Sequence, residues 1–180
     1  MPKLINHQGA VVAPEWIEFS GDAGAVDNDS NVILPLDVWR EYRQRWLARK
    51  GAIGVALSPS DDPLLLAEDL ERLSLITIAF PSFTDGRGYS SGRLVRERLG
   101  FQGELRAVGE VLIDQLYYMA RCGFSTFALR DDQALDAAAR ALRTFSDNYQ
   151  ATFERAPLFA RRSASINALT EQSWKTAALA

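Results

Sequence analysis

Residues 75–100 read LITIAFPSFTDGRGYSSGRLVRERLG, and this stretch decides the fold class. The run Leu75–Phe80 is apolar on both faces apart from Thr77, a pattern typical of a central parallel strand. A polar loop with glycines follows, and a helix is expected from Ser90 to Leu99, closed by Gly100. A strand, a loop and a helix in this order predict one βα unit, with ligand-binding positions in the loop after the strand.

The same alternation of strand and helix signals recurs on both sides of this stretch. Further strands are predicted at Val32–Leu34, Ala52–Leu57, Glu104–Val108 and Phe124–Leu129. Further helices are predicted at 35–49, from Asp61 or Asp62 with Pro63 to Leu73, at Glu110–Arg121, and from Asp131 or Asp132 to Phe145. We therefore expect an α/β fold of repeated βα units with a mainly parallel five-stranded sheet. Five units are too few for a barrel of roughly 250 residues, so the sheet is either open or a partial TIM-like barrel.

The two ends of the chain differ from this repeat. Strands at Lys3–Asn6 and Ala10–Phe19 predict an N-terminal β-hairpin at one edge, with Pro14 making the second strand irregular. Ser20–Asn31 is a loop by composition. We expect a single α/β domain over residues 1–150 and a partly disordered C-terminal extension over 151–180.

Composition limits the classes of function. The 180 residues carry 20 Lys and Arg against 23 Asp and Glu, a net charge of −3 that gives no footprint for nucleic acid. No apolar stretch approaches the roughly 20 residues of a membrane helix, and the start lacks a secretion signal, so a cytoplasmic protein without membrane contact is expected. Cys122 and His7 are the single residues of their types. The chain alone therefore cannot supply the four ligands of an iron–sulfur cluster or a structural zinc, and we expect no metal site.

Candidate site residues follow from the fold, because the carboxyl ends of parallel strands meet at one edge of a sheet. Arginines, a helix start and hydrogen-bond donors there favour an anion. The predicted anion-binding residues are Asp85, Arg87, Tyr89, Ser90, Arg93, Arg106, Glu110 and Arg130. Catalytic and cofactor-binding residues stay unassigned, since no nucleophile–base pair can be identified.

Structural interpretations of the same residues stay open beside this one. Gly86 and Gly88 can simply shape a turn, and Arg93, Arg96 and Arg98 can form the solvated face of a helix. Arg106 lies inside a strand and needs a carboxylate partner: Glu104, Glu110 or Asp85. The alternative for Arg106 is a structural ion pair on an edge or barrel-lining strand.

The segment GRGYSSG, residues 86–92, superficially matches a dinucleotide-binding glycine loop. In that motif the glycines lie directly at the turn from strand to helix, whereas Pro81–Asp85 intervene here. The match is therefore discounted, although a nucleotide stays an alternative ligand.

Phe80–Asp132, FPSFTDGRGYSSGRLVRERLGFQGELRAVGEVLIDQLYYMARCGFSTFALRDD, resembles the bacterial family called domain of unknown function 934. The stretches MPKLI and VILPL also fit the pattern of that family. The resemblance implies sulfur assimilation, because members are often encoded beside the assimilatory sulfite reductase haemoprotein and are labelled oxidoreductases of sulfite reduction. It supplies no established catalytic residues and no cofactor.

Two functions are expected on these grounds. The first is an accessory protein of assimilatory sulfite reduction that acts with the sulfite reductase haemoprotein, in electron or substrate delivery or in complex assembly. A small anion such as sulfite would then meet the arginine-lined helix start. The alternative is a small α/β enzyme that binds an anionic metabolite or nucleotide at the rim formed by the carboxyl ends of the strands. Self-association into a homo-oligomer is compatible with both.

Overall fold

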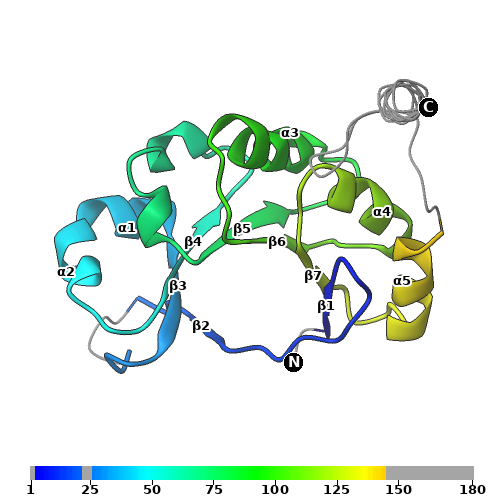
Figure 1. Cartoon of the computed structure of the whole chain (residues 1–180), viewed down its shortest axis with the longest axis horizontal. Coiled ribbons are helices and arrows are strands. Elements are labelled where there is room, and N and C mark those ends of the chain that lie inside the picture. Colours follow the sequence, from blue (N-terminus) through cyan, green and yellow to red (C-terminus); the bar gives the residue numbers. More distant parts are fainter. Residues whose placement is uncertain (1–2, 22–25, 145–180) are drawn as a thin grey trace, which may run out of the picture.

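The computed structural model describes residues 3–21 and 26–144, which form an α/β fold around one curled, open sheet of seven strands (Figure 1). The strand order is β1-β7-β6-β5-β4-β3-β2. β1 is antiparallel to β7, and the other five pairs are parallel. The strands are β1 (Lys3–Asn6), β2 (Trp16–Glu18), β3 (Asn31–Pro35), β4 (Ile53–Leu57), β5 (Leu75–Phe80), β6 (Glu104–Gly109) and β7 (Thr126–Leu129).

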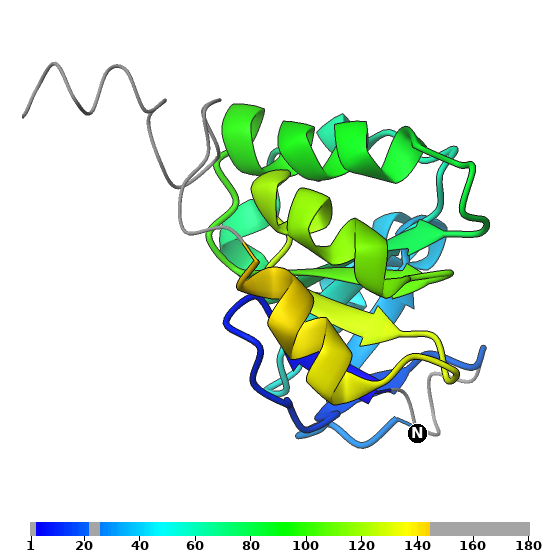
Figure 2. The same cartoon turned by 90° about the vertical axis from the view of Figure 1, so that its right-hand side faces the viewer.

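The helices lie along the outer side of the curled sheet (Figure 1), and Figure 2 shows α3, α4 and α5 stacked over that side. They are α1 (Leu36–Glu41), α2 (Arg43–Leu47), α3 (Arg87–Arg93), α4 (Ile113–Arg121) and α5 (Leu135–Leu142). Two short 3-10 turns, η1 (Pro63–Leu66) and η2 (Leu70–Arg72), connect β4 to β5, and a π-helical turn, η3 (Leu94–Arg98), continues α3. The inner, concave face of the sheet is lined by side chains of the strands themselves.

The main core fills the space between the helices and the outer face of the sheet. Side chains alternate along a strand, so Ile76 and Ile78 of β5 point toward the helices while Thr77 points to the concave face. Ile76 and Ile78 belong to the buried cluster that also contains Trp39 and Trp46 of the first two helices. The sheet is thus covered on one face, and its other face curls around a separate interior.

The prediction of a five-stranded, mainly parallel sheet is wrong in count, because the sheet has seven strands of mixed direction. The five predicted parallel strands do form, as β3 to β7. The N-terminal segments add one strand at each edge, where a short strand needs only one neighbour. The open α/β sheet that the alternation predicts is confirmed.

The predicted N-terminal hairpin forms only in its first part, where the Asn6 N–H donates to the carbonyl of Ala10 and the Val12 N–H donates to that of Leu4. Only Val11 bridges Ile5 beside β1, and Pro14 follows in a stretch without strand structure. Pro14 has no N–H to donate to a ladder, so continuous pairing cannot run through it. The chain then crosses to the opposite edge, where Trp16–Glu18 form β2 parallel to β3.

Several predicted helices are shorter or broken. The helix expected over 35–49 is interrupted at Tyr42, whose side chain is exposed. The helix expected after Asp62 becomes η1 and η2, and Asp69, between them, directs its buried carboxylate to Trp39 Nε1 at 3.0 Å and to Arg43. Asp62 does cap this segment, as predicted, by accepting the N–H of Leu64 at 2.9 Å.

The remaining boundaries differ by a few residues at each end. α3 begins at Arg87 rather than Ser90, α4 begins at Ile113 rather than Glu110, and β7 begins at Thr126. Phe145, predicted as the end of the last helix, and the C-terminal extension 151–180 lie outside the described residues, as does part of the loop Ser20–Asn31.

Two glycines of the GRGYSSG segment allow α3 to pack closely on the sheet. A Cβ atom at Gly88 would lie 2.6 Å from Cζ of Phe80, and one at Gly92 would lie 2.5 Å from Cε2 of Phe124. Both contacts are too short for any side chain. Gly88 and Gly92 are therefore required for helix–sheet packing, which explains the glycine pattern without a dinucleotide.

Across residues 3–21 and 26–144, no helix has the length and apolar character needed to cross a membrane.

Candidate functional site at the carboxyl edge of the sheet

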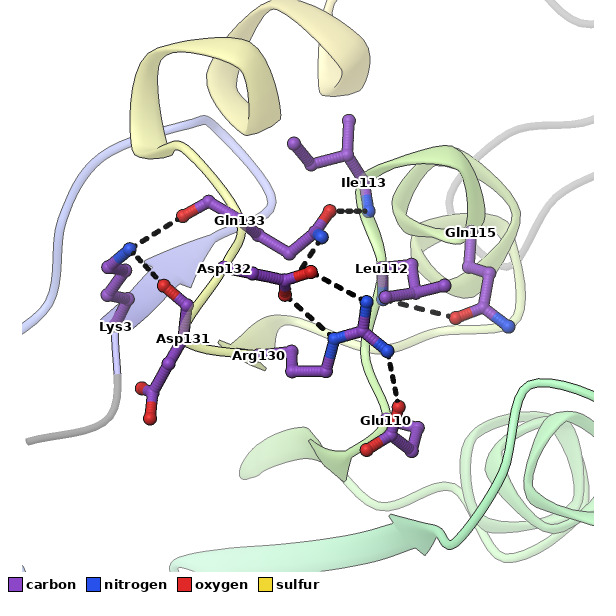
Figure 3. A network of polar contacts seen from close by, with 9 residues as sticks. All are labelled: Lys3, Glu110, Leu112, Ile113, Gln115, Arg130, Asp131, Asp132 and Gln133. Atoms are coloured by element: carbon purple, nitrogen blue, oxygen red, sulfur yellow. Dashed lines mark hydrogen bonds and ion pairs between the residues drawn. The ribbon is translucent and has the colours of Figure 1, made fainter.

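Arg130 is the centre of a charged network at the carboxyl ends of β6 and β7, which we call the rim network (Figure 3). Its Nη1 donates to Glu110 Oε2 at 2.7 Å. Its Nε donates to Asp132 Oδ1 and its Nη2 donates to Asp132 Oδ2, each at 2.7 Å. Glu110 and Arg130, two of the predicted site residues, are thus in direct contact at this edge. Asp132 and then Glu110 raise the pKa of the Arg130 guanidinium, and Arg130 holds the pKa of the Asp132 carboxyl well below its usual range.

Hydrogen bonds to the surrounding backbone fix this network in place (Figure 3). Lys3 Nζ donates to the carbonyl oxygens of Asp131 at 2.6 Å and Gln133 at 2.8 Å. Gln133 Oε1 accepts the N–H of Ile113 at 3.1 Å, at the start of α4. Lys3 and Gln133 were not predicted as site residues, because their roles depend on the antiparallel pairing of β1 with β7, which no local pattern indicates.

Asp85 and Arg87 form a separate pair in the loop after β5. Arg87 Nη2 lies 2.7 Å from Asp85 Oδ2, and Arg87 Nε donates to Oδ1 at 3.0 Å. The side chain of Arg87 is 62% exposed. The Arg87 side chain and backbone together hold the pKa of the Asp85 carboxyl below its usual range. Within the described residues, no hydrogen bond or ion pair joins Arg87 to Glu110 or Arg130.

Tyr89, Ser90 and Arg93 lie on α3 and do not converge on the rim network. The Tyr89 ring packs against Phe80, with centroids 5.1 Å apart, and burial raises the pKa of its hydroxyl. Ser90 is exposed. Arg93 pairs with Glu97 one turn later at 2.9 Å, on the exposed face of the helix. Arg93 therefore occupies a solvated helix face, the structural interpretation that the sequence left open.

For Arg96 the interpretation of a solvated helix face is wrong, because this residue is buried, with an exposed fraction of 6%. Its Nε donates to the carbonyl of Gly123 at 2.7 Å, and its Nη1 donates to those of Phe101 at 2.6 Å and Gly103 at 2.7 Å. The guanidinium lies 5.5 Å from the centroid of the Phe101 ring. Arg96 thus fastens α3 to the loops beside β6 and β7, a structural role that the sequence reading missed.

Arg106 lies on the concave face of β6, away from the rim network. Its Nε donates to Glu104 Oε1 at 2.9 Å and its Nη2 lies 2.8 Å from the same oxygen, which also accepts the Thr126 hydroxyl. Of the three carboxylates predicted as partners, Glu104 is the one that binds it. The side chain is 7% exposed. The interpretation of a barrel-lining strand with an ion pair therefore describes Arg106.

The concave face encloses a cavity of about 390 Å³ that every strand helps to line. Its polar lining comes from Thr77, Arg106 and Glu18. Its apolar lining comes from Leu4, Phe19, Ile33, Pro35, Ala56, Val108, Ala128 and Leu129. Pro35, Gly109 and Leu129 end their strands, so the cavity reaches the carboxyl edge where Arg130 and Glu110 lie.

The predicted anion-binding arginines already have carboxylate partners within the chain. Arg87, Arg93, Arg106 and Arg130 each already pair with a carboxylate of this chain. A free anion at any of them would have to share the guanidinium with that carboxylate or displace it. Anion binding by the predicted set stays a prediction.

Side chains of the types that bind metals do not cluster within the described residues, and the single thiol is buried. Among residues 3–21 and 26–144, no group of three or more His, Cys, Asp or Glu side chains is arranged to hold a metal ion. Cys122 is buried, and this burial raises the pKa of its thiol, so little thiolate forms near neutral pH.

Comparison with known proteins gives a family without a described activity. A family model described as "Bacterial protein of unknown function (DUF934)" matches residues 54–159. No curated protein matches the chain. The matched range contains the loop after β5, the strand that carries Arg106, and the network residues Glu110, Arg130 and Asp132, whereas Lys3 lies outside it.

Proposed function

The chain belongs to the DUF934 family of bacterial proteins, and we propose that it is an accessory protein of assimilatory sulfite reduction that docks on the sulfite reductase haemoprotein. The pathway is the one that the resemblance of Phe80–Asp132 implies. The docking surface in this proposal is the carboxyl edge of the sheet.

The observation that carries the proposal is the acidic character of that edge. Each of the five strands from β3 to β7 is followed by carboxylates: Asp37 after β3, Asp61 and Asp62 after β4, Asp85 after β5, Glu110 and Asp114 after β6, and Asp131 and Asp132 after β7. They outnumber Lys3, Arg87 and Arg130, the cations placed among them. Such an edge is complementary to a basic protein surface and would steer association with it.

An exposed aromatic residue adds a contact of another kind. Phe83, in the loop after β5, is 55% exposed and lies two residues before Asp85 of the Asp85–Arg87 pair. An aromatic side chain surrounded by charged groups is a common anchor of protein–protein interfaces.

The same charges favour docking over carriage of sulfite at this edge. A sulfite dianion would have to separate Arg87 from Asp85, or Arg130 from two carboxylates, and would meet repulsion from the remaining acidic groups. With one cysteine and one histidine, the chain cannot supply the ligands of an iron–sulfur cluster, so such a cluster would belong to the partner.

Growth of a deletion strain tests the proposal. We expect the strain to fail on sulfate and on sulfite as sulfur source and to grow on sulfide, because the missing step is the reduction of sulfite. Complementation with Asp114→Lys/Asp131→Lys should be impaired, whereas Glu71→Lys, an exposed acidic residue on η2, should complement fully. Growth of the deletion strain on sulfite would overturn the proposal.

A second candidate is a small α/β enzyme that binds an anionic metabolite or nucleotide. The cavity inside the curled sheet favours it, since about 390 Å³ lies within the usual range for small-molecule sites. Sulfide-only rescue of the deletion strain would count against this candidate.

A further inference from the structure

We propose that the cavity inside the curled sheet binds a small organic molecule with an anionic oxygen head group, held by Arg106 and Thr77. The head group is a carboxylate, phosphate or sulfonate, and an apolar remainder fills the rest of the cavity. This site is distinct from the acidic docking edge and does not depend on the proposed accessory role.

The first step of the argument is that Arg106 is not saturated by its own chain. Its Nε and Nη2 both approach one oxygen of Glu104, and no described residue accepts a hydrogen bond from its Nη1. Arg96 provides an internal comparison, because it is equally buried and directs its donors to the carbonyls of Gly123, Phe101 and Gly103. Buried guanidinium donors are normally bonded, as those of Arg96 are. The open donor of Arg106 therefore marks a place for a ligand atom.

The second step is the neighbour of Arg106 in the sheet. Thr77 lies directly beside Arg106 in the β5–β6 register, so both side chains point to the concave face. Thr77 is 4% exposed, yet its hydroxyl has no hydrogen-bond partner among the described residues. By contrast, Thr126 on the other side of Arg106 donates to Glu104. Two adjacent donors that are accessible from the cavity and have no protein partner there suit an oxygen-rich head group.

The third step is the shape and lining of the space above these donors. Ala56 lies in the same row as Thr77 and Arg106, and Val108 and Ala128 lie one row nearer the carboxyl edge, so the walls beside and beyond the two donors are small or aliphatic. A water molecule occupies about 30 Å³ in the liquid, so the 390 Å³ cavity holds far more than a bare inorganic anion. The ligand is therefore an organic anion whose apolar part packs against Ala56, Val108 and Ala128, which together form an apolar collar in the cavity.

Glu18 adds a further preference. Glu18 lines the same cavity, is exposed, and has no hydrogen-bond or ion-pair partner among the described residues. It can accept a hydrogen bond from an ammonium or hydroxyl group on the ligand. Ligands that combine an anionic head with such a donor should bind more tightly than those with the head alone.

Binding of matched probes, followed by amide NMR shifts of the full chain, tests the proposal. The probes are 3-phenylpropionate, phenylalanine, phenylphosphate, benzenesulfonate and the uncharged 3-phenylpropanol, with inorganic phosphate and sulfite as bare anions. We expect at least one organic anion to shift the amides of Ala56, Thr77 and Val108, with an affinity about tenfold or more above that of the alcohol. The bare anions should bind more weakly still.

Three variants connect the binding to the cavity. Thr77→Val removes one donor without removing a protein hydrogen bond and should lower the affinity for the probe about tenfold. Ala56→Leu fills the collar and should abolish binding, whereas Ala48→Leu at an exposed helix end should not change it. Arg106→Met/Glu104→Gln removes both charges together, so no unpaired carboxylate is left, and should also abolish binding.

Three results would overturn the proposal. The first is that no organic anion binds at concentrations of about 10 mM, far above a fragment Kd of about 1 mM. The second is that 3-phenylpropanol binds as well as the anions. The third is that the shifts cluster around Arg130 and Arg87 and persist in Ala56→Leu.

Discussion

Replacing Arg96 by methionine tests whether this arginine is a structural tie or part of an anion site. The change removes three hydrogen bonds of 2.6 to 2.7 Å to backbone carbonyls and leaves those carbonyls without the donor. A hydrogen bond from a charged group contributes roughly 1.5–3 kcal/mol, and relief of a buried charge offsets part of the loss. We therefore expect the free energy of unfolding to fall by about 4 kcal/mol.

A loss of this size is large against the roughly 5–15 kcal/mol of a typical domain. It corresponds to a decrease in Tm of roughly 8–16 °C for a chain of this length. Urea denaturation followed by far-UV circular dichroism and thermal scans measure both quantities. Arg98→Met is the matched control, because Arg98 is exposed on the same π-helical turn and should change stability by no more than about 0.5 kcal/mol.

The reasoning would be refuted by a loss of less than about 1 kcal/mol for Arg96→Met, or by an equal loss for Arg98→Met. Either result would mean that the three carbonyls find other donors or that Arg96 is solvated. Arg96→Lys should fall between wild type and Arg96→Met, since an ammonium keeps the charge but does not match the planar spread of a guanidinium.

Three further changes test other parts of the account. Gly88→Ala should cost about 1–3 kcal/mol because its Cβ would press on the buried Phe80 ring, whereas Gly86→Ala meets only Tyr89 at 3.9 Å and should be near neutral in the same urea titration. Thr77→Val should leave stability unchanged or raise it slightly, while Thr126→Val should lower it by about 1 kcal/mol, because only Thr126 donates to Glu104; equal effects would contradict the assigned contacts. The pKa of Asp132 is lower in the folded state than in the unfolded state, so the contribution of this carboxylate to stability is present above the unfolded pKa and is lost as the pH falls through the folded pKa. The difference in free energy of unfolding between wild type and Asp132→Asn should therefore become smaller below about pH 4. A difference that grows in acid would contradict this assignment.

The parallel part of the fold could be predicted because its signals are local. Leu75–Phe80 is apolar on both faces, and Asp62 with Pro63 begins η1 as its residue types suggest. The edges could not be predicted, because β2 has only three residues and because β1 pairs with β7, a strand far from it in the sequence. Pro14 did indicate that pairing stops near it, but not where the chain goes next.

The candidate site could be predicted only in part, namely where it follows from the parallel arrangement of neighbouring strands. Glu110 and Arg130 follow adjacent strands, so their meeting follows from the parallel arrangement. Arg96 was misplaced although a signal existed, since it lies four and eight residues after Gly92 and Gly88, on the stripe of the helix that packs on the sheet. The pairing of Thr77 with Arg106 depends on strand register, which a single sequence does not fix.

Binding of the purified chain to the purified sulfite reductase haemoprotein tests the proposed accessory role most directly. Isothermal titration at low and at physiological salt should show a complex that weakens as salt rises, because an acidic edge contributes to it. Asp114→Lys/Asp131→Lys should weaken this complex about tenfold or more, and Glu71→Lys should leave it unchanged. The absence of a complex at low salt, or a complex indifferent to both salt and the edge variant, would contradict the account.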